Sequence, residues 1–219
     1  MKRRKLILFS LLAAFIMLIY GISYAVSPTR QARIATEEEL PKLKELVGDR
    51  YQDFHFASRE ELAKAYLGEP IPSYKIHNFD ANKSIVEQMK KSDFYVFPVI
   101  VDGKAATDIP VVLENQEWKV VDIGGHLSRV IQNVKLNHKL TEIKVLKFYE
   151  ATFVLGKKGN KLVGFLPYRG SRELGIEKGE LIKIEKIEKL IENQKKDVET
   201  RQQKYEETGE IQYGSSEKL

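Results

Sequence analysis

A cationic and apolar opening segment is the feature that most constrains this chain. Four consecutive cations at residues 2–5 precede an apolar run over residues 6–20, and small residues follow at Ser23 and Ala25. This order is typical of a secretory signal peptide that is cleaved after Ala25. The competing interpretation is that residues 6–26 serve as an uncleaved membrane anchor, because a membrane-spanning helix needs about 20 apolar residues. Either interpretation sends the rest of the chain outward, since the cations precede the apolar run.

The remainder of the chain predicts an α+β fold, with an antiparallel sheet packed against helices. The sheet is expected to consist of a three-stranded meander followed by a second hairpin unit. We expect a linker over residues 26–35, the α+β domain over residues 36–176, a charged amphipathic helix over residues 177–207 and a flexible tail over residues 208–219.

Two helices are expected at the start of the domain. Thr36 can cap the first helix, because three glutamates follow it and suit the positive end of the helix dipole, and Gly48 is a stop signal. Ser58 and Glu61 form the pattern of a capping box at the start of the second helix. The side chains expected to face inward from these helices are Leu40, Leu43, Leu46, Leu62, Ala65 and Tyr66. A short strand is expected within residues 72–79 and a third, short helix within residues 82–93.

The meander is predicted from residues 94–123. Residues 94–101 are rich in β-branched and aromatic side chains, and the Asp102-Gly103 pair that follows is a strong signal for a two-residue hairpin. Residues 105–113 return, with Pro110 indicating an edge or a bulge. Residues 118–123 form the third strand, which two glycines close. Trp118 and the apolar residues of this stretch are explained by packing against the helices, so the stretch is interpreted as a folding unit.

The second half of the domain repeats the alternation of helix and strands. A short helix is expected over residues 127–136, and a β unit over residues 141–168 reverses at its GKKGN turn. In the C-terminal helix, isoleucines at 184, 187 and 191 lie at heptad spacing, but Gln194 interrupts the seam. This pattern fits a solvated amphipathic helix that rests on the sheet, and a helix that binds a partner remains the alternative.

Charge and cysteine content limit the function classes. The chain has 36 Lys and Arg residues against 31 Asp and Glu residues, and without the four N-terminal cations the balance is 32 against 31. The basic isoelectric point therefore reflects the opening segment, and nucleic acid is not an expected partner. The lack of cysteine excludes disulfides, thiolate metal sites, cysteine nucleophiles and a lipid-modified cysteine. A cysteine-free exported chain fits a secreted or membrane-anchored bacterial protein.

His126 is the weak catalytic candidate. It follows two glycines that allow close backbone approach, and Asp122 or Ser128 could assist it as a general base. The structural alternative is that the glycines end a strand and His126 begins the next helix. A nucleophile elbow and an oxyanion donor are not recognisable in the sequence. His55 and His77 each have an aspartate within three residues, but neither has a metal-ligand spacing, so no metal and no cofactor are predicted.

The candidate binding residues come from a basic segment. Residues 135–172 contain nine cations and two acids, interleaved with aromatic residues, which resembles the face with which OB-like barrels bind polyanions. Because the chain is predicted to be exported, an envelope polymer or a lipid headgroup is the expected polyanion. Solubilising charge on exposed strands is the alternative explanation. The residues chosen are Lys157, Lys158, Lys161, Arg169 and Arg172.

The motifs LGEPIPSYKI and FPVIVDGK, followed by WKVVDIGG, resemble a group of uncharacterised exported bacterial proteins with the pattern LGxPxxxYxI…FPVxVDGK…WxVVxIGG. The resemblance covers about residues 58–170. It implies an extracytoplasmic α+β domain and implies no catalytic residue.

We therefore expect an exported, non-enzymatic cell-surface or secreted binding protein. Its partner would be a protein or an envelope polyanion, and the membrane would be a further contact through residues 6–26 if the segment is not cleaved. One alternative is an exported hydrolase with a site near His126. The other is a polyanion or nucleic-acid binder that uses residues 135–172.

Overall fold

The computed structural model describes residues 27–171 and 175–208. Within these residues the fold is α+β, as predicted, and nine strands form one mixed, mostly antiparallel sheet. The predicted signal peptide or anchor at residues 1–25, Arg172 and residues 209–219 of the predicted tail lie outside the described residues.

The elements follow in chain order. The helices are α2 (Pro28–Val47), the 3-10 helix η1 (Gly48–Phe54), α3 (Arg59–Lys64), α4 (Ile85–Gln88), α5 (Leu127–His138) and α6 (Ile184–Thr208). The strands are β1 (Tyr66–Leu67), β2 (Ile71–Lys75), β3 (Lys90–Val101), β4 (Lys104–Glu114), β5 (Glu117–Val120), β6 (Thr141–Phe148), β7 (Ala151–Lys158), β8 (Lys161–Phe165) and β9 (Ile182–Lys183).

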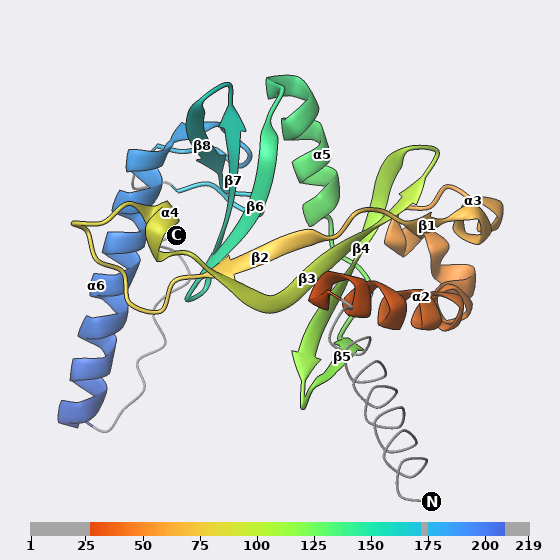
Figure 1. Cartoon of the computed structure of the whole chain (residues 1–219), viewed down its shortest axis with the longest axis horizontal. Coiled ribbons are helices and arrows are strands. Elements are labelled where there is room, and N and C mark those ends of the chain that lie inside the picture. Colours follow the sequence, from red (N-terminus) through yellow and green to blue (C-terminus); the bar gives the residue numbers. More distant parts are fainter. Residues whose placement is uncertain (1–26, 172–174, 209–219) are drawn as a thin grey trace, which may run out of the picture.

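One parallel pair joins the two predicted β units into a single sheet. The strand order is β5-β4-β3-β2-β6-β7-β8-β9. The short strand β1 is not in this series and pairs with β3, as β2 does. Among the described strands, β2 and β6 pair in parallel and the other pairs are antiparallel. Figure 1 shows the strands β2 and β3 running between two lobes, with α2 at one end of the molecule and α6 at the other.

The α2 lobe, which contains α2, η1, α3, β1, β4 and β5, has its own core. Phe97 of β3 and Ile109 and Val111 of β4 are fully buried there, together with Val47 at the end of α2. Tyr95 packs its ring against Trp118, with the ring centroids 5.2 Å apart. The apolar residues of the meander thus pack against helices, as predicted from their pattern.

The α6 lobe, which contains α4, β6 to β9 and α6, is built around a second core. The buried Ile187 and Ile191 of α6 face Phe153 and Leu146 of the sheet. Gly164 in β8 allows this close packing, because a Cβ there would lie 2.8 Å from the carbonyl oxygen of Val154 and would collide with Ile187. The first half of α6 therefore rests on the sheet, as expected, whereas Tyr205 near its end is exposed.

Helix α5 covers the opposite face of the sheet between the two lobes. Leu127, Ile131 and Val134 of this helix pack on Val145 and Val154. Since Val145 and Leu146 are consecutive in β6, their side chains point to opposite faces. The α5 face and the α6 face of the sheet are therefore separate surfaces.

The first helix begins earlier than its sequence indicates. It starts at Pro28 with Ser27 as the N-cap, so residues 28–35 of the predicted linker are helical and Thr36 lies inside the helix. The hydroxyl of Thr36 donates to the carbonyl of Ala32 at 2.7 Å, and the residue is fully buried. Proline is favoured in the first turn of a helix, and this signal outweighs the acidic residues that suggested a later start.

Tyr66 does not face inward as predicted. The second helix ends at Lys64, and Tyr66 begins β1, where 53% of the residue is exposed. Ala65 is buried as expected. Pairing of Tyr66 with Ile100 of β3 extends the chain before Gly68 and Pro70 can act as helix terminators.

Leu46 near the end of α2 is also wrong as an inward-facing residue, because it is 74% exposed. Other local sequence signals agree with the structure. The Ser58 side chain accepts from the Glu61 N–H at 3.3 Å, as the capping box predicts. Asp102 and Gly103 have φ values of 48° and 76°, which a two-residue turn of the predicted kind requires. Pro110 lies in β4 next to the last β5 pair, Val111–Val120, and its carbonyl accepts from the Val121 N–H at 3.1 Å, so its missing N–H faces the end of the β4–β5 ladder.

The length and apolar character of the helices bear on membrane crossing. Within residues 27–171 and 175–208, none of them combines the length and the apolar character that crossing a bilayer requires.

Candidate functional site

His126 lies at the start of α5, as the structural alternative anticipated. It is the N-cap residue, and Gly124 and Gly125 before it have φ values of 138° and 88°. Its ring packs edge-on against Tyr168, with the centroids 5.5 Å apart. Its Nε2 atom is buried and has no hydrogen-bond partner among the described residues.

Asp108 is the polar centre beside His126, and it is not among the residues predicted from the sequence. Its carboxylate accepts from the backbone N–H groups of Leu127 at 2.6 Å and of Ser128 at 3.2 Å, and from the Ser128 hydroxyl. The residue is 4% exposed, and burial raises the pKa of its carboxyl group despite these hydrogen bonds. Asp108 thus takes the capping role that the His126 side chain does not fill.

This capping arrangement uses the groups that could have assisted His126. Ser128 donates its hydroxyl to Asp108, and Asp122 bonds to the N–H of Ile123, the next residue. No hydrogen bond joins either side chain to His126 in the described part of the chain. A base that activates a hydroxyl must lie within hydrogen-bond reach of it, and this pairing is not formed here.

His55 lies near the same helix end. Its Nε2 is 3.2 Å from a guanidinium nitrogen of Arg129, and desolvation followed by the Arg129 charge lowers the pKa of His55. Among residues 27–171 and 175–208, no group of three side chains of the metal-binding kinds comes together.

The predicted basic residues separate into two places. Lys157, Lys158 and Lys161 lie at the tip of the β7–β8 hairpin, where Lys157 forms an ion pair with Glu142 at 2.8 Å. Arg169 lies beyond the other end of β8 and lines a cavity beside α6, whereas Arg172 is outside the described residues. The residues therefore do not share one continuous face.

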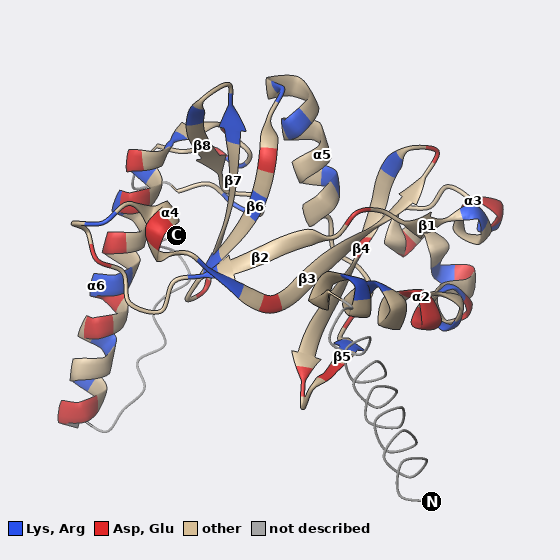
Figure 2. Cartoon of the chain, viewed as in Figure 1, with Lys and Arg blue, Asp and Glu red and all other residues tan. Residues whose placement is uncertain are grey.

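The pairing of β2 with β3 and β6 creates a different basic surface. Lys75 of β2 is the Cα partner of Lys90 of β3 and also of Lys147 of β6. All three residues are exposed, and none of them forms an ion pair within the described part of the chain. We call Lys75, Lys90 and Lys147 the lysine row. Figure 2 shows blue residues where these three strands meet.

Aromatic side chains support the row and two lysines beside it. The Lys147 ammonium lies 3.6 Å from the centre of the Phe94 ring, and desolvation lowers the pKa of this lysine. Lys91 and Lys144 also have their ammonium groups over rings, those of Tyr95 and Tyr74, but both lysines lie on the other face of the sheet, because each is an odd number of positions from its row lysine, Lys90 or Lys147. Asp93 of β3 and Glu142 of β6 are the acids in these strands, and Glu150 lies in the turn after β6.

The sequence carried a partial signal for this surface. The strings SYK, KKSDFY and KVLKFY each place lysine next to an aromatic residue. The three strings are separated by up to about 70 residues, however, and pairing between β2 and β6 is needed to bring them together.

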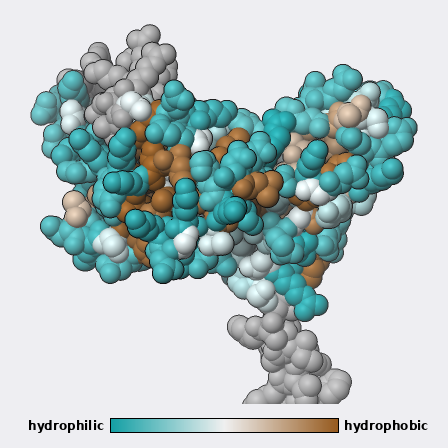
Figure 3. Space-filling view, turned by 90° about the horizontal axis from the view of Figure 1, so that it is seen from above, coloured by the Kyte–Doolittle hydropathy of each residue, from teal (hydrophilic) through white to brown (hydrophobic). Residues whose placement is uncertain are grey.

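An apolar groove lies on the α5 side of the α2 lobe. It has a volume of about 260 Å³, and prolines and isoleucines from β2, β3 and α5 provide most of its lining. Figure 3 shows apolar side chains in the hollows of a surface that is otherwise hydrophilic. Lys135 and Glu69 also contribute to the lining, so the groove carries both signs of charge.

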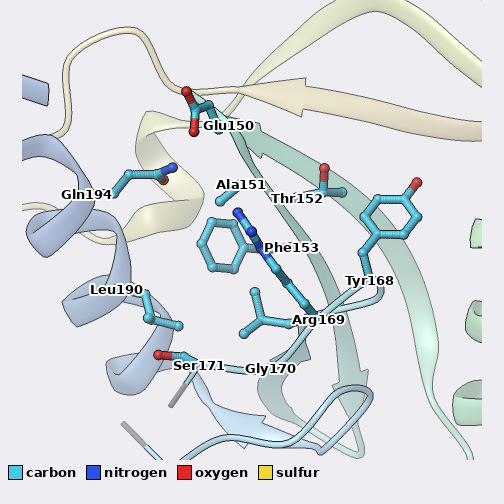
Figure 4. Close-up of a pocket in the computed structure, with 11 residues that line it drawn as sticks. Glu150, Ala151, Thr152, Phe153, Tyr168, Arg169, Gly170, Ser171, Leu190 and Gln194 are labelled. Atoms are coloured by element: carbon cyan, nitrogen blue, oxygen red, sulfur yellow. The ribbon is translucent and has the colours of Figure 1, made fainter. Parts of the chain in front are cut away.

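A smaller cavity lies on the α6 side of the sheet. It has a volume of about 60 Å³ and is bounded by β7, the segment after β8, and α6. Figure 4 shows the Arg169 side chain extending into it over Phe153. Ser171 closes one end, and its Oγ atom is buried with no hydrogen-bond partner among the described residues.

Comparisons with known proteins add no relative to this description. No family model matches the chain, and no curated protein and no solved structure matches it.

Proposed function

We propose that this protein is an exported, non-enzymatic binding protein that holds an anionic polymer of the cell envelope against the lysine row. The export part rests on the cationic and apolar segment over residues 2–25 and on the resemblance to exported bacterial proteins. The binding part rests on the arrangement of the three lysines.

The single observation that carries the binding proposal is the register of the lysine row. Like charges directly opposite each other on adjacent strands destabilise a sheet by a few tenths of a kcal/mol or more. Lys75 has such a neighbour on both sides, and no described acid forms an ion pair with any of the three. A ligand with repeated negative charges would relieve this repulsion on binding.

Aromatic support adds a second reason. Lys147 has its ammonium group held over the Phe94 ring. A lysine that is held in place loses less side-chain entropy when it binds an anion. Flexible lysines on a hairpin tip lack this advantage, although Lys158 and Lys161 also face each other there.

The hydrolase alternative has less support. Asp108 and Ser128 bond to each other and cap α5, and His126 has no hydrogen-bond partner among the described residues. We therefore assign no catalytic role to His126 in this proposal.

The test uses the full chain in a non-ionic detergent and fluorescently labelled polyphosphate as the probe. We expect the variant Lys75→Gln/Lys90→Gln/Lys147→Gln to bind at least about tenfold more weakly at low salt. The matched control is Lys157→Gln/Lys158→Gln/Lys161→Gln, which removes the same charge from the hairpin tip and should change affinity less than about twofold. Equal weakening by both variants would show that net charge, and not the lysine row, determines binding.

A further inference from the structure

The cavity beside α6 contains cationic and polar groups that the proposed polymer binding does not use. It lies on the α6 face, because its lining residue Phe153 belongs to the core that α6 covers. The lysine row lies on the α5 face. Lys147 comes two positions after Val145 in β6, so the two side chains point to the same face, and α5 packs on Val145. A ligand in the cavity would therefore be independent of a polymer on the row.

Two side chains of the cavity lack partners. In the described part of the chain, Arg169 makes no ion pair and no hydrogen bond, and Figure 4 shows its guanidinium group within the cavity. Ser171 is 2% exposed, and its Oγ atom is unpaired among the described residues. An unpaired buried hydroxyl costs about 1–3 kcal/mol, so its presence in the lining of the cavity favours an external partner.

The other polar groups of the cavity are engaged or turned away. The Gln194 amide, oriented so that its nitrogen donates to the Phe148 carbonyl at 3.0 Å, accepts from the Ala151 N–H at 3.2 Å. Glu150 lies at the rim, and in Figure 4 its carboxylate points away from Arg169. Arg169 and Ser171 are therefore the groups that remain for a ligand.

The geometry points to a carboxylate with a short aliphatic group as the ligand. A guanidinium binds a carboxylate through two parallel hydrogen bonds, and the Ser171 hydroxyl at the end of the cavity is a further polar group that the ligand can contact. Leu166, Leu190 and Phe153 supply an apolar wall. The volume of about 60 Å³ admits only a group of a few atoms. We propose that the cavity binds such a carboxylate, either as a free acid or as the C-terminal residue of a peptide.

The experiment titrates the full chain, labelled with ¹⁵N-arginine in detergent, with butyrate and with its uncharged analogue butyramide. The Arg169 side-chain signal is assigned by its loss in Arg169→Lys. We expect butyrate to shift this signal at millimolar concentration and butyramide to leave it unchanged. The same titration with N-acetyl-alanyl-alanine and its C-terminal amide separates a peptide end from a free acid. Equal shifts with the uncharged analogues, or no shift with any acid at about 50 mM, would overturn the proposal.

Variants link the binding to individual groups. Calorimetry should show at least about tenfold weaker butyrate binding for Arg169→Gln and about fivefold weaker binding for Ser171→Ala. Arg50→Gln, in the other lobe, is the control and should bind like wild type. Glu150→Gln should bind as tightly as wild type, because the Glu150 carboxylate points away from Arg169. Unchanged binding in Arg169→Gln would contradict the proposal, and the triple lysine variant should retain butyrate binding even if polymer binding fails.

Discussion

Asp108 and the lysine row show opposite uses of charge in one sheet. Asp108 is buried in β4, and its carboxylate receives hydrogen bonds from two backbone N–H groups and one hydroxyl at the start of α5. The three lysines of the row are exposed on adjacent strands, and each has a like charge as its neighbour. The first arrangement satisfies its groups internally, whereas the second leaves them available.

This difference separates structural from binding roles. Hydrogen bonds at the end of a helix fix α5 on the sheet and leave little capacity for a substrate. Unbalanced charge in a sheet lowers stability and is relieved when an anion binds. His126 and Ser128 follow a glycine pair and resemble catalytic residues in the sequence. Their hydrogen-bond partners in the structure indicate a structural role for Ser128 and none for the His126 side chain.

The largest expected effect on stability comes from removing the Asp108 carboxylate, which is hydrogen-bonded within the protein. Asp108→Ala leaves two buried backbone donors and the Ser128 hydroxyl without an acceptor. We expect the free energy of unfolding to fall by about 3–5 kcal/mol, measured by urea denaturation. Asp122→Ala is the control, because Asp122 is exposed, and should cost less than about 1 kcal/mol. A loss below 1 kcal/mol for Asp108→Ala would remove the contrast between the two regions.

Gln194 offers a second test of how much a buried, hydrogen-bonded side chain contributes to stability. Its amide bonds to both sides of the β6–β7 turn, and the residue is 5% exposed. Gln194→Leu should lower the free energy of unfolding by about 2 kcal/mol, because a buried carbonyl and a buried N–H lose their partners. Gln202→Leu, further along α6, should change it by less than about 0.5 kcal/mol. Equal effects of the two changes would contradict the described role of Gln194.

The pH dependence of stability sharpens the comparison at Asp108. Burial raises the pKa of its carboxyl group above the usual value of 3.8, so the folded state holds this proton at a higher pH than the unfolded state. The Asp108 contribution to stability should therefore fall as pH rises through the window between the two pKa values, with a slope of at most about 1.4 kcal/mol per pH unit. Denaturation curves of wild type and Asp108→Asn from pH 3 to 7 isolate this slope by difference. A difference that increases with pH in that window would show that the hydrogen bonds outweigh desolvation.

The smallest effect concerns the stability of the lysine row. Lys75→Glu converts two like-charge pairs into two opposite-charge pairs, so the free energy of unfolding should rise by about 0.5–1 kcal/mol at low salt. Lys119→Glu breaks the ion pair with Glu114 and should produce no such gain. A stability loss in Lys75→Glu would mean that the row is not a site of repulsion.

Local signals in the sequence predicted the elements better than their arrangement. The capping box at Ser58 and the Asp102-Gly103 turn depend on neighbouring residues, and both occur as expected. The start of α2 was wrong because proline in a first turn outweighed the acidic run beginning at Glu37. The parallel pairing of β2 with β6 joins residues about 70 positions apart and has no local signal.

The candidate sites show the same difference between local sequence signals and long-range arrangement. Arg169 was selected from composition, and the structure adds its cavity and the unpaired Ser171. Asp108 was not selected, because an isolated aspartate in a strand gives no sign that it will meet a helix end 19 residues later. The lysine row was missed because Lys75 and Lys90 precede the basic segment from which candidates were taken.

The salt dependence of polyphosphate binding tests the central claim most directly. Each lysine that contacts a phosphate releases about one counterion, so the logarithm of affinity falls with the logarithm of salt concentration in proportion to the number of contacts. The slope should be smaller by about three in the triple Gln variant of the lysine row than in wild type, and unchanged in the matched hairpin-tip variant. An unchanged slope in the lysine-row variant would contradict the assignment of this surface as the binding site.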